Sequence, residues 1–449
     1  MPAESRTDNF TVADKAAPAA AASLYSCFIL LKKSHPTQCK KEVETVTPIL
    51  YTEIYDELYS FIQTLPVIST HSHHEKDAFH TDLNLDSLLK KSYVYWCGAV
   101  FDSTPESRRL FLEKVRFNSY FIWLEKALAQ IYHFDDPITA GNWDRVSGLI
   151  SAANKNDNHH LDLLTHWCKY EKIILDAYWN PGSDNNHPDL FAPTFRINMF
   201  LYGYSRKAAD HNGNNPEAAY GIKTKDIDEY ISCVRDIIVK KKREGCIALK
   251  SALAYDRGLN FSQASRERAQ AALTAAEDAV TPEDIKAFGD YVFFEICKTA
   301  AELGLPVQCH TGLGALKETN AMQMREVIEK NPDTRFVLFH GGYPWLDDVL
   351  ALTHFYKNVY PDICWLPIIS TSAAERMIIE LIEVSTIDKI CWGCDTWTAE
   401  ESAGALLAMR HALAGALSKM AADGYFSINS AKKAAENILY NNAKAIYKL

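Results

Sequence analysis

Residues 65–73 read Leu-Pro-Val-Ile-Ser-Thr-His-Ser-His, a short apolar run that ends in two histidines one residue apart. Side chains on an extended strand repeat every two residues, so His71 and His73 are expected to point to the same side. Two imidazoles at one strand end can hold one metal ion. Alone, this pattern is weak evidence for a metal site, because a chain with 15 histidines contains such pairs by chance.

Three later segments repeat the arrangement. His310, His340 and Asp395 each follow a β-prone apolar run and precede a turn or a helix. Barrels and doubly wound sheets build their active sites at the carboxyl ends of several strands. Four such coincidences predict one site assembled from strand ends.

Apolar runs also alternate with helical patterns along the chain. Residues 172–178, 195–201 and 246–249 are candidates for strands two to four, and residues 389–395 for strand eight. Repeated βα units predict a parallel sheet with helices outside. Eight candidate strands predict an α/β fold, a (β/α)8 TIM barrel, since only closure brings the first and eighth strands together. A doubly wound open sheet is the alternative, and it would scatter the site residues along one edge.

The 449 residues suffice for a barrel of roughly 250 residues with insertions. Residues 1–48 are expected to form a weakly ordered arm, and residues 49–449 the barrel. Residues 74–168 are rich in aromatic side chains and contain no clear strand run. They predict a helical insertion after the first strand, or a cap over the site.

Composition narrows the classes of function. The formal net charge of −10 argues against nucleic-acid binding and against an anionic membrane surface, and favours a small-molecule substrate. The 11 cysteines are scattered along the chain without the spacing of a secreted domain, so we expect the protein in a reducing cytoplasm. Residues 1–22 lack the basic start of an export signal, and the apolar patch at residues 27–31 is too short to cross a membrane. Association into a homo-oligomer stays open.

One ordered set of residues resembles the amidohydrolase superfamily of metal-dependent barrels: His71, His73, Lys250, His310, His340 and Asp395. The segments 248–255, 340–344 and 436–443 are similar to a branch with amidohydrolase-related decarboxylases, the amidohydrolase-like domain of nodulin/glutamine-synthetase fusions and, more distantly, uronate isomerases. The resemblance covers roughly residues 60–449. Thr70 departs from it, because many relatives carry Asp before the histidine pair.

The candidate metal ligands are His71, His73, His310 and Asp395, with His340 and Lys250 as further candidates. Imidazoles and a carboxylate favour zinc, although manganese or iron would also fit, and one or two ions are compatible with the set. Asp395 is expected to move the proton of an attacking water, and His340 to bind a second ion or polarise the substrate. In similar proteins a carbamylated lysine at the position of Lys250 bridges two metals. Hydrogen bonding to Asp395 or to substrate is the alternative for Lys250.

Substrate contacts are predicted from position. Arg196 and Arg257 lie on or just after strands three and four and could clamp a carboxylate, although such arginines often form structural ion pairs. Tyr255 and Trp345 lie near strand ends and could form an aromatic wall, or pack a loop.

These residues favour a metal-dependent hydrolase that cleaves an amide, lactone or similar bond of a small carboxylated substrate. The first alternative is a non-oxidative decarboxylase, recognised by carbon dioxide release without water consumption. The second is a uronate-type isomerase, recognised by solvent deuterium in the product. A silent scaffold would be expected to have lost ligands, and none is lost here.

Overall fold

The computed structural model describes residues 43–276 and 279–449, so most of the predicted arm lies outside the described residues. Seven strands form one sheet in chain order, and every neighbouring pair is parallel. They are β1 (Val67–Ser72), β2 (Tyr170–Leu175), β3 (Phe191–Arg196), β4 (Ala248–Ser251), β5 (Val307–Cys309), β6 (Phe336–Leu338) and β7 (Val359–Pro361).

The segment 391–395 occupies the eighth position of the barrel. On one side, the amide of Cys391 donates to Pro361 O at 3.1 Å, beside β7. On the other side, the amide of Thr70 in β1 donates to Trp392 O at 3.1 Å, and the amide of Asp395 donates to His71 O at 2.9 Å. The segment carries an isolated bridge between Asp362 and Cys391 instead of a regular strand. The predicted (β/α)8 barrel is therefore confirmed, with an irregular eighth element.

One predicted strand is displaced. β3 begins at Phe191 and ends at Arg196, whereas residues 198–202 form a short 3-10 helix. The apolar run 195–201 predicted the wrong bounds for this strand. Its second half is apolar because it is buried as a helical turn beyond the end of the strand. The correction leaves Arg196 at the carboxyl end of β3, opposite Lys250 of β4 in the register.

Helices follow most strands. They are α1 (Val43–Thr64), α8 (Pro216–Tyr220), α9 (Ile227–Arg243), α10 (Arg266–Thr274), α11 (Pro282–Leu303), α12 (Arg325–Lys330), α13 (Leu346–Phe355), α14 (Leu366–Ile369), α15 (Thr371–Val384), α16 (Ala399–Ala422), α17 (Ile428–Glu436) and α18 (Asn442–Tyr447). The start of α11 follows from its sequence, since Thr281 caps it by accepting from the amide of Asp284. Gly304 ends α11 with a left-handed backbone, φ 66°.

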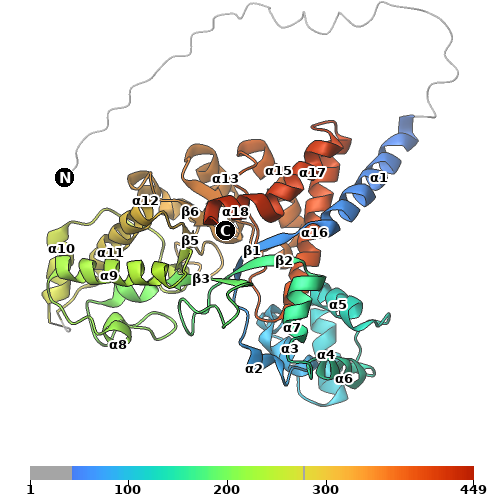
Figure 1. The fold of residues 1–449 in the computed structure, drawn as a ribbon, viewed down its shortest axis with the longest axis horizontal. Coiled ribbons are helices and arrows are strands. Elements are labelled where there is room, and N and C mark those ends of the chain that lie inside the picture. Colours follow the sequence, from blue (N-terminus) through green and yellow to red (C-terminus); the bar gives the residue numbers. More distant parts are fainter. Residues whose placement is uncertain (1–42, 277–278) are drawn as a thin grey trace, which may run out of the picture. The chain divides into compact units, whose positions relative to one another are not determined.

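Residues between β1 and β2 form a group of helices with its own apolar cluster. These helices are α2 (Asp77–His80), α3 (Leu85–Lys91), η1 (Tyr93–Cys97), α4 (Pro105–Val115), α5 (Ser119–Tyr132), α6 (Trp143–Ala153), α7 (His159–Asp162) and η2 (Leu163–Trp167). Phe111 and Trp143 are buried at the centre of this cluster. Figure 1 shows α3, α4 and α6 grouped together, with α5 beside α16. Helix α16 is buried along most of its length because it packs between α5 and α15.

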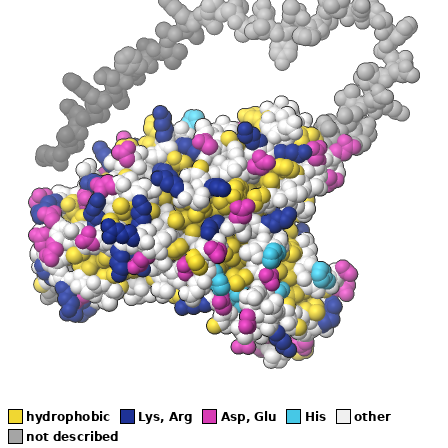
Figure 2. All heavy atoms as spheres, viewed as in Figure 1, with side chains coloured by type: hydrophobic (Ala, Val, Ile, Leu, Met, Phe, Trp, Pro, Cys, Tyr) yellow, Lys and Arg dark blue, Asp and Glu magenta, His cyan; other side chains and the backbone are white. Residues whose placement is uncertain are grey.

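The surface in Figure 2 carries acidic and basic side chains in a mixture, with Lys and Arg gathered over α9. The run Lys240–Arg243 forms the last turn of α9, where cations favour the helix dipole, and Lys241 pairs with Glu244 at 3.0 Å. None of the described helices is both long enough and apolar enough to cross a membrane.

Candidate metal centre

The first two candidate ligands lie at the end of β1, as the two-residue period predicts. His71 and His73 are buried, and their ring centroids lie 4.7 Å apart. His71 Nε2 and His73 Nε2 lie 3.5 and 3.3 Å from the same atom, Asp395 Oδ1. Two imidazole nitrogens and one carboxylate oxygen therefore converge on one point.

Asp395 is held in this position by its backbone. Its amide is bonded to β1, and its φ of 57° is in the left-handed region, which aspartate tolerates better than most residues. Asp395 Oδ1 is buried and accepts no hydrogen bond from any described residue. A buried carboxylate oxygen without a donor is costly unless a cation or proton faces it. The orphaned oxygen and the two imidazole nitrogens fit a divalent ion of the zinc class.

A backbone carbonyl fixes the orientation of the His73 ring. Its Nδ1 lies 2.8 Å from the carbonyl oxygen of Asp176, which follows β2. A carbonyl can only accept, so Nδ1 carries the proton and Nε2 presents its lone pair toward Asp395 and His71. Metal-binding histidines are commonly held in this way by an outer carbonyl or carboxylate.

His310 and His340 form a second imidazole pair at the ends of β5 and β6. His310 Nδ1 lies 2.9 Å from His340 Nε2, and His340 Nδ1 lies 3.6 Å from Asp395 Oδ2. His340 also has a left-handed backbone, φ 66°, and its Nδ1 lies 3.2 Å from Cys364 O. The carboxylate of Asp395 thus lies between the β1 pair and His340.

Lys250 ends β4 inside the same group. Its Nζ lies 3.3 Å from His71 Nε2 and 4.0 Å from the centre of the Phe339 ring. The side chain is buried, and burial lowers its pKa below the usual 10.5. All six residues of the predicted ligand set are therefore neighbours in the structure.

Burial also sets the charges of the other groups. It holds the pKa values of His71 and His340 well below 6.5, and Lys250 adds to the lowering, so these imidazoles are neutral at pH 7. Neutral imidazole is the form that binds metal ions. Burial raises the pKa of Asp395 above 3.8, against the attraction of His73 and Lys250.

A cavity of about 210 Å³ opens beside these groups. It is lined by His71, His73, Tyr93, Trp96, Tyr178, Arg196, His211, Asn212, Lys250, Ala252, Tyr255, His310, Asp395 and Trp397. Arg196 is buried against Asp176: its Nε lies 3.3 Å from Oδ1, and its Nη2 is bonded to Oδ2 at 2.5 Å. Its Nη1 lies 3.3 Å from His211 Nε2.

Two predicted substrate contacts are not brought to this cavity. Arg257 Nη2 donates to Asp290 Oδ1 at 2.7 Å, which makes it a structural ion pair with α11. Trp345 is not among the cavity-lining residues and is about one third exposed just before α13. Tyr255 does line the cavity, and its ring centroid lies 4.5 Å from that of His310.

Sequence reasoning missed several residues in and behind the site, among them Asp176 and Tyr93. Asp176 interrupts the apolar run after strand two, so a carboxylate at a strand end was a readable signal. Tyr93 comes from η1 in the insertion and lines the cavity, and its interaction with Asp395 lowers the pKa of that carboxyl. Its place could not be read from spacing, because it depends on how η1 packs beside Trp397 and Trp365.

Imidazole and carboxylate groups that could hold a metal ion therefore converge at the strand ends of a parallel barrel. Residues 263–449, less than half of the chain, match the family model described as amidohydrolase, and over this stretch the predicted resemblance is confirmed. Among curated proteins, a 156-residue stretch is 30% identical to protein fluG of Emericella nidulans. That match covers 32% of this chain and only 17% of the relative's length.

Solved structures share the fold over nearly the whole chain. Uronate isomerase from Thermotoga maritima superimposes with a TM-score of 0.72 at 16% identity, covering 88% of this chain and 97% of its own. Glucuronate isomerase from Caulobacter crescentus gives 0.70 at 16% identity, with 89% and 94% covered. A candidate metal-dependent hydrolase from Lactobacillus casei gives 0.64 at 14% identity, with 87% and 97% covered. Identities this low establish a common fold alone.

Proposed function

We propose that this protein is a metal-dependent hydrolase that cleaves an amide, lactone or similar bond of a small carboxylated substrate. The observation that carries the proposal is the convergence of His71 Nε2 and His73 Nε2 on Asp395 Oδ1, an oxygen with no donor among the described residues. The three atoms lie at the wall of a cavity that a small molecule can enter.

The donor set suits zinc best, with manganese or iron as alternatives. A bound divalent ion would supply Lewis acidity and lower the pKa of a coordinated water. His71, His73 and Asp395 would hold the first ion. His340 and His310 lie close enough to one another to share a second, with a carbamylated Lys250 as the bridge. The lowered pKa of Lys250 supports that modification, because only the neutral amine reacts with carbon dioxide.

Asp395 is the proton carrier in this proposal. Its Oδ1 faces the β1 imidazoles, while Oδ2 lies 3.6 Å from His340 Nδ1. A carboxylate between these groups can accept a proton from the attacking water and return it to the leaving group. Tyr93 and Trp96, both from the insertion, line the cavity beside this carboxylate, so we assign the insertion the role of a cap.

Charge favours an anionic substrate. With one ion and an unmodified Lys250, the cations Arg196 and Lys250 are balanced by the carboxylates Asp176 and Asp395, so the divalent ion would leave the cavity positive. The guanidinium of Arg196 already binds Asp176 through Nε and Nη2, and its Nη1 faces His211 at the cavity wall. Arg196 therefore has one face left for a substrate carboxylate. The volume of about 210 Å³ limits the substrate to a small molecule.

The test is to incubate the metal-loaded full chain with small lactones and N-acyl amino acids in H₂¹⁸O, followed by mass spectrometry of the products. Hydrolysis places one ¹⁸O atom in the new carboxylate, and the Asp395→Asn variant should not produce it. Release of carbon dioxide without ¹⁸O uptake would replace the proposal with decarboxylation. Deuterium at carbon after reaction of uronates in D₂O would replace it with isomerisation.

The cellular setting of this activity is also a proposal. The scattered cysteines favour a reducing cytoplasm. Small-molecule turnover requires neither nucleic acid nor a membrane, and a homo-oligomer is compatible with it.

A further inference from the structure

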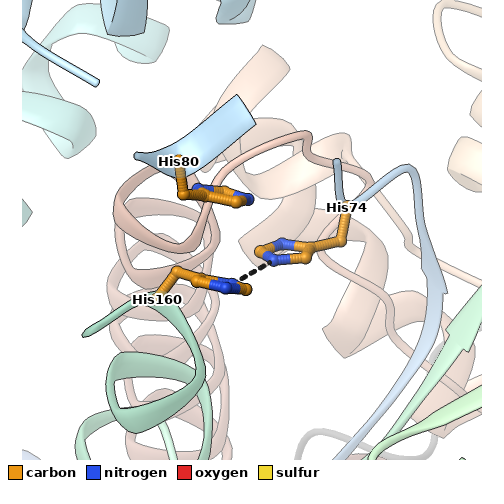
Figure 3. Close-up of side chains that lie close together, drawn as sticks. All are labelled: His74, His80 and His160. Atoms are coloured by element: carbon orange, nitrogen blue, oxygen red, sulfur yellow. Dashed lines mark hydrogen bonds between the residues drawn. The ribbon is translucent and has the colours of Figure 1, made fainter. Parts of the chain in front are cut away.

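A second group of histidines lies outside the candidate metal centre. In Figure 3 the rings of His80 and His160 lie one above the other and both extend toward His74, and each of the three residues offers one ring nitrogen within 4.8 Å of the others. His74 Nε2 lies 3.0 Å from His160 Nδ1. The rings of His80 and His160 are parallel, with centroids 4.1 Å apart. None of the three lines the cavity beside Asp395.

The group is buried and incompletely bonded. The three residues are only 1–2% exposed, and neither nitrogen of His80 has a hydrogen-bond partner among the described residues. Burial lowers the pKa of His80 to about 3 and that of His160 to about 4, so both rings are neutral at pH 7. A buried ring nitrogen without a partner is destabilising, because it has lost its hydrogen bonds to water and gained none in the protein. Two such nitrogens on one side chain are hard to explain by packing alone.

A carboxylate lies near His160, on the side of its Nε2. Asp77 Oδ1 lies 3.5 Å from His160 Nε2, and the same atom lies 2.9 Å from His187 Nε2. A proton on His160 Nε2, facing this carboxylate, leaves the lone pair of Nδ1 directed at His74 Nε2, with which it forms a hydrogen bond. The separation of 3.0 Å is close to the roughly 3.3 Å between two nitrogens on a tetrahedral ion with bonds of about 2.05 Å. Carboxylates behind metal-binding histidines commonly play the part of Asp77.

The three histidines come from separate elements. His74 lies two residues after β1, His80 ends α2, and His160 belongs to α7, which η2 separates from β2. The cluster therefore joins the first residue of the cap, residues 74–168, to a helix near its end. His74 also adjoins His73, a candidate ligand of the barrel site.

We propose that His74, His80 and His160 form a second, structural metal site that takes a zinc-class divalent transition ion. Three imidazole nitrogens suit such an ion better than Mg²⁺ or Ca²⁺, which prefer oxygen ligands. The ion ties both ends of the cap to the end of β1. In this way it holds the backbone that carries His73.

The test uses chelator-stripped full chain reloaded with Zn²⁺, and metal content measured by elemental mass spectrometry. The His80→Asn/His160→Asn variant should bind one equivalent less than the wild type. The His71→Ala/His73→Ala variant should keep one equivalent and still gain thermal stability on adding Zn²⁺. His166→Asn, which removes an exposed histidine from the same stretch of chain, should match the wild type.

Either of two results would overturn the site: full zinc content in the His80→Asn/His160→Asn variant, or no zinc in a folded His71→Ala/His73→Ala variant. If the variants do not fold, wild-type crystals soaked in Zn²⁺ decide the question. An anomalous peak between the three imidazoles is expected, and its absence would refute the proposal. Neither readout depends on hydrolysis, so failure of the proposed activity would leave this test intact.

Discussion

Asp362, beyond the end of β7, should make the stability of the protein depend on pH. Its side chain is fully buried, Thr70 Oγ1 donates to its Oδ2 at 2.6 Å, and the amide of Cys364 donates to its Oδ1 at 2.9 Å. Burial raises its pKa from 3.8 to about 7 despite these two donors. The perturbation is Asp362→Asn, which keeps the shape and can bond both partners without ionising.

The sign follows from proton binding. Between pH 4 and pH 7 the folded protein holds this proton and the unfolded chain has lost it, so stability falls as the pH rises through that window. The two pKa values differ by about 3, which corresponds to about 4 kcal/mol in total. Between pH 5 and pH 8 the wild type should lose about 3 kcal/mol that Asp362→Asn does not lose.

The assay is urea unfolding of metal-stripped protein at pH 5 and pH 8, followed by tryptophan fluorescence. Metal is removed because a cation near the site would favour the ionised carboxylate. Other buried acids titrate alike in both proteins and cancel in the difference. Asp333→Asn, at an exposed position, serves as the control and should follow the wild type. Equal pH dependence in wild type and Asp362→Asn would refute the reasoning.

Three further substitutions test the site. Asp395→Asn should lower kcat by about 10²–10⁴-fold with little change in circular dichroism, and unchanged turnover would remove Asp395 from proton transfer. Arg196→Lys should raise KM for a carboxylated substrate about 10–100-fold, since lysine cannot bind Asp176 and substrate through a planar fork, but should leave KM for an uncharged analogue unaltered. Gly393→Ala would place Cβ 2.5 Å from His71 N and 2.8 Å from Thr70 Oγ1. The substitution should therefore lower the free energy of unfolding by about 1–3 kcal/mol and weaken zinc binding. A Tm and a zinc affinity equal to those of the wild type would contradict this packing.

The barrel and its ligand set could be predicted because both rest on local pattern. His71, His310 and His340 each follow a buried apolar run, and parallel topology alone then brings strand ends to one edge. Residues 389–395 predicted the eighth strand. Only its backbone hydrogen bonds, which join it to β7 and β1, show that the strand is irregular.

What could not be predicted depends on packing between distant segments. Arg196 and Arg257 are alike in sequence position, yet one faces the cavity and the other is turned into an ion pair with Asp290. The place of Tyr93 depends on the fold of the insertion, and the cluster around His80 joins residues 74, 80 and 160 without a regular spacing. Such groups become visible only when the chain is folded.

Metal content of the purified full chain, compared with the His71→Ala/His73→Ala variant, tests the central claim most directly. The wild type should hold at least one equivalent of zinc, manganese or iron more than the folded variant; two more would favour a pair bridged by Lys250. Equal metal content in the two proteins would contradict the assignment of His71, His73 and Asp395 as a metal site.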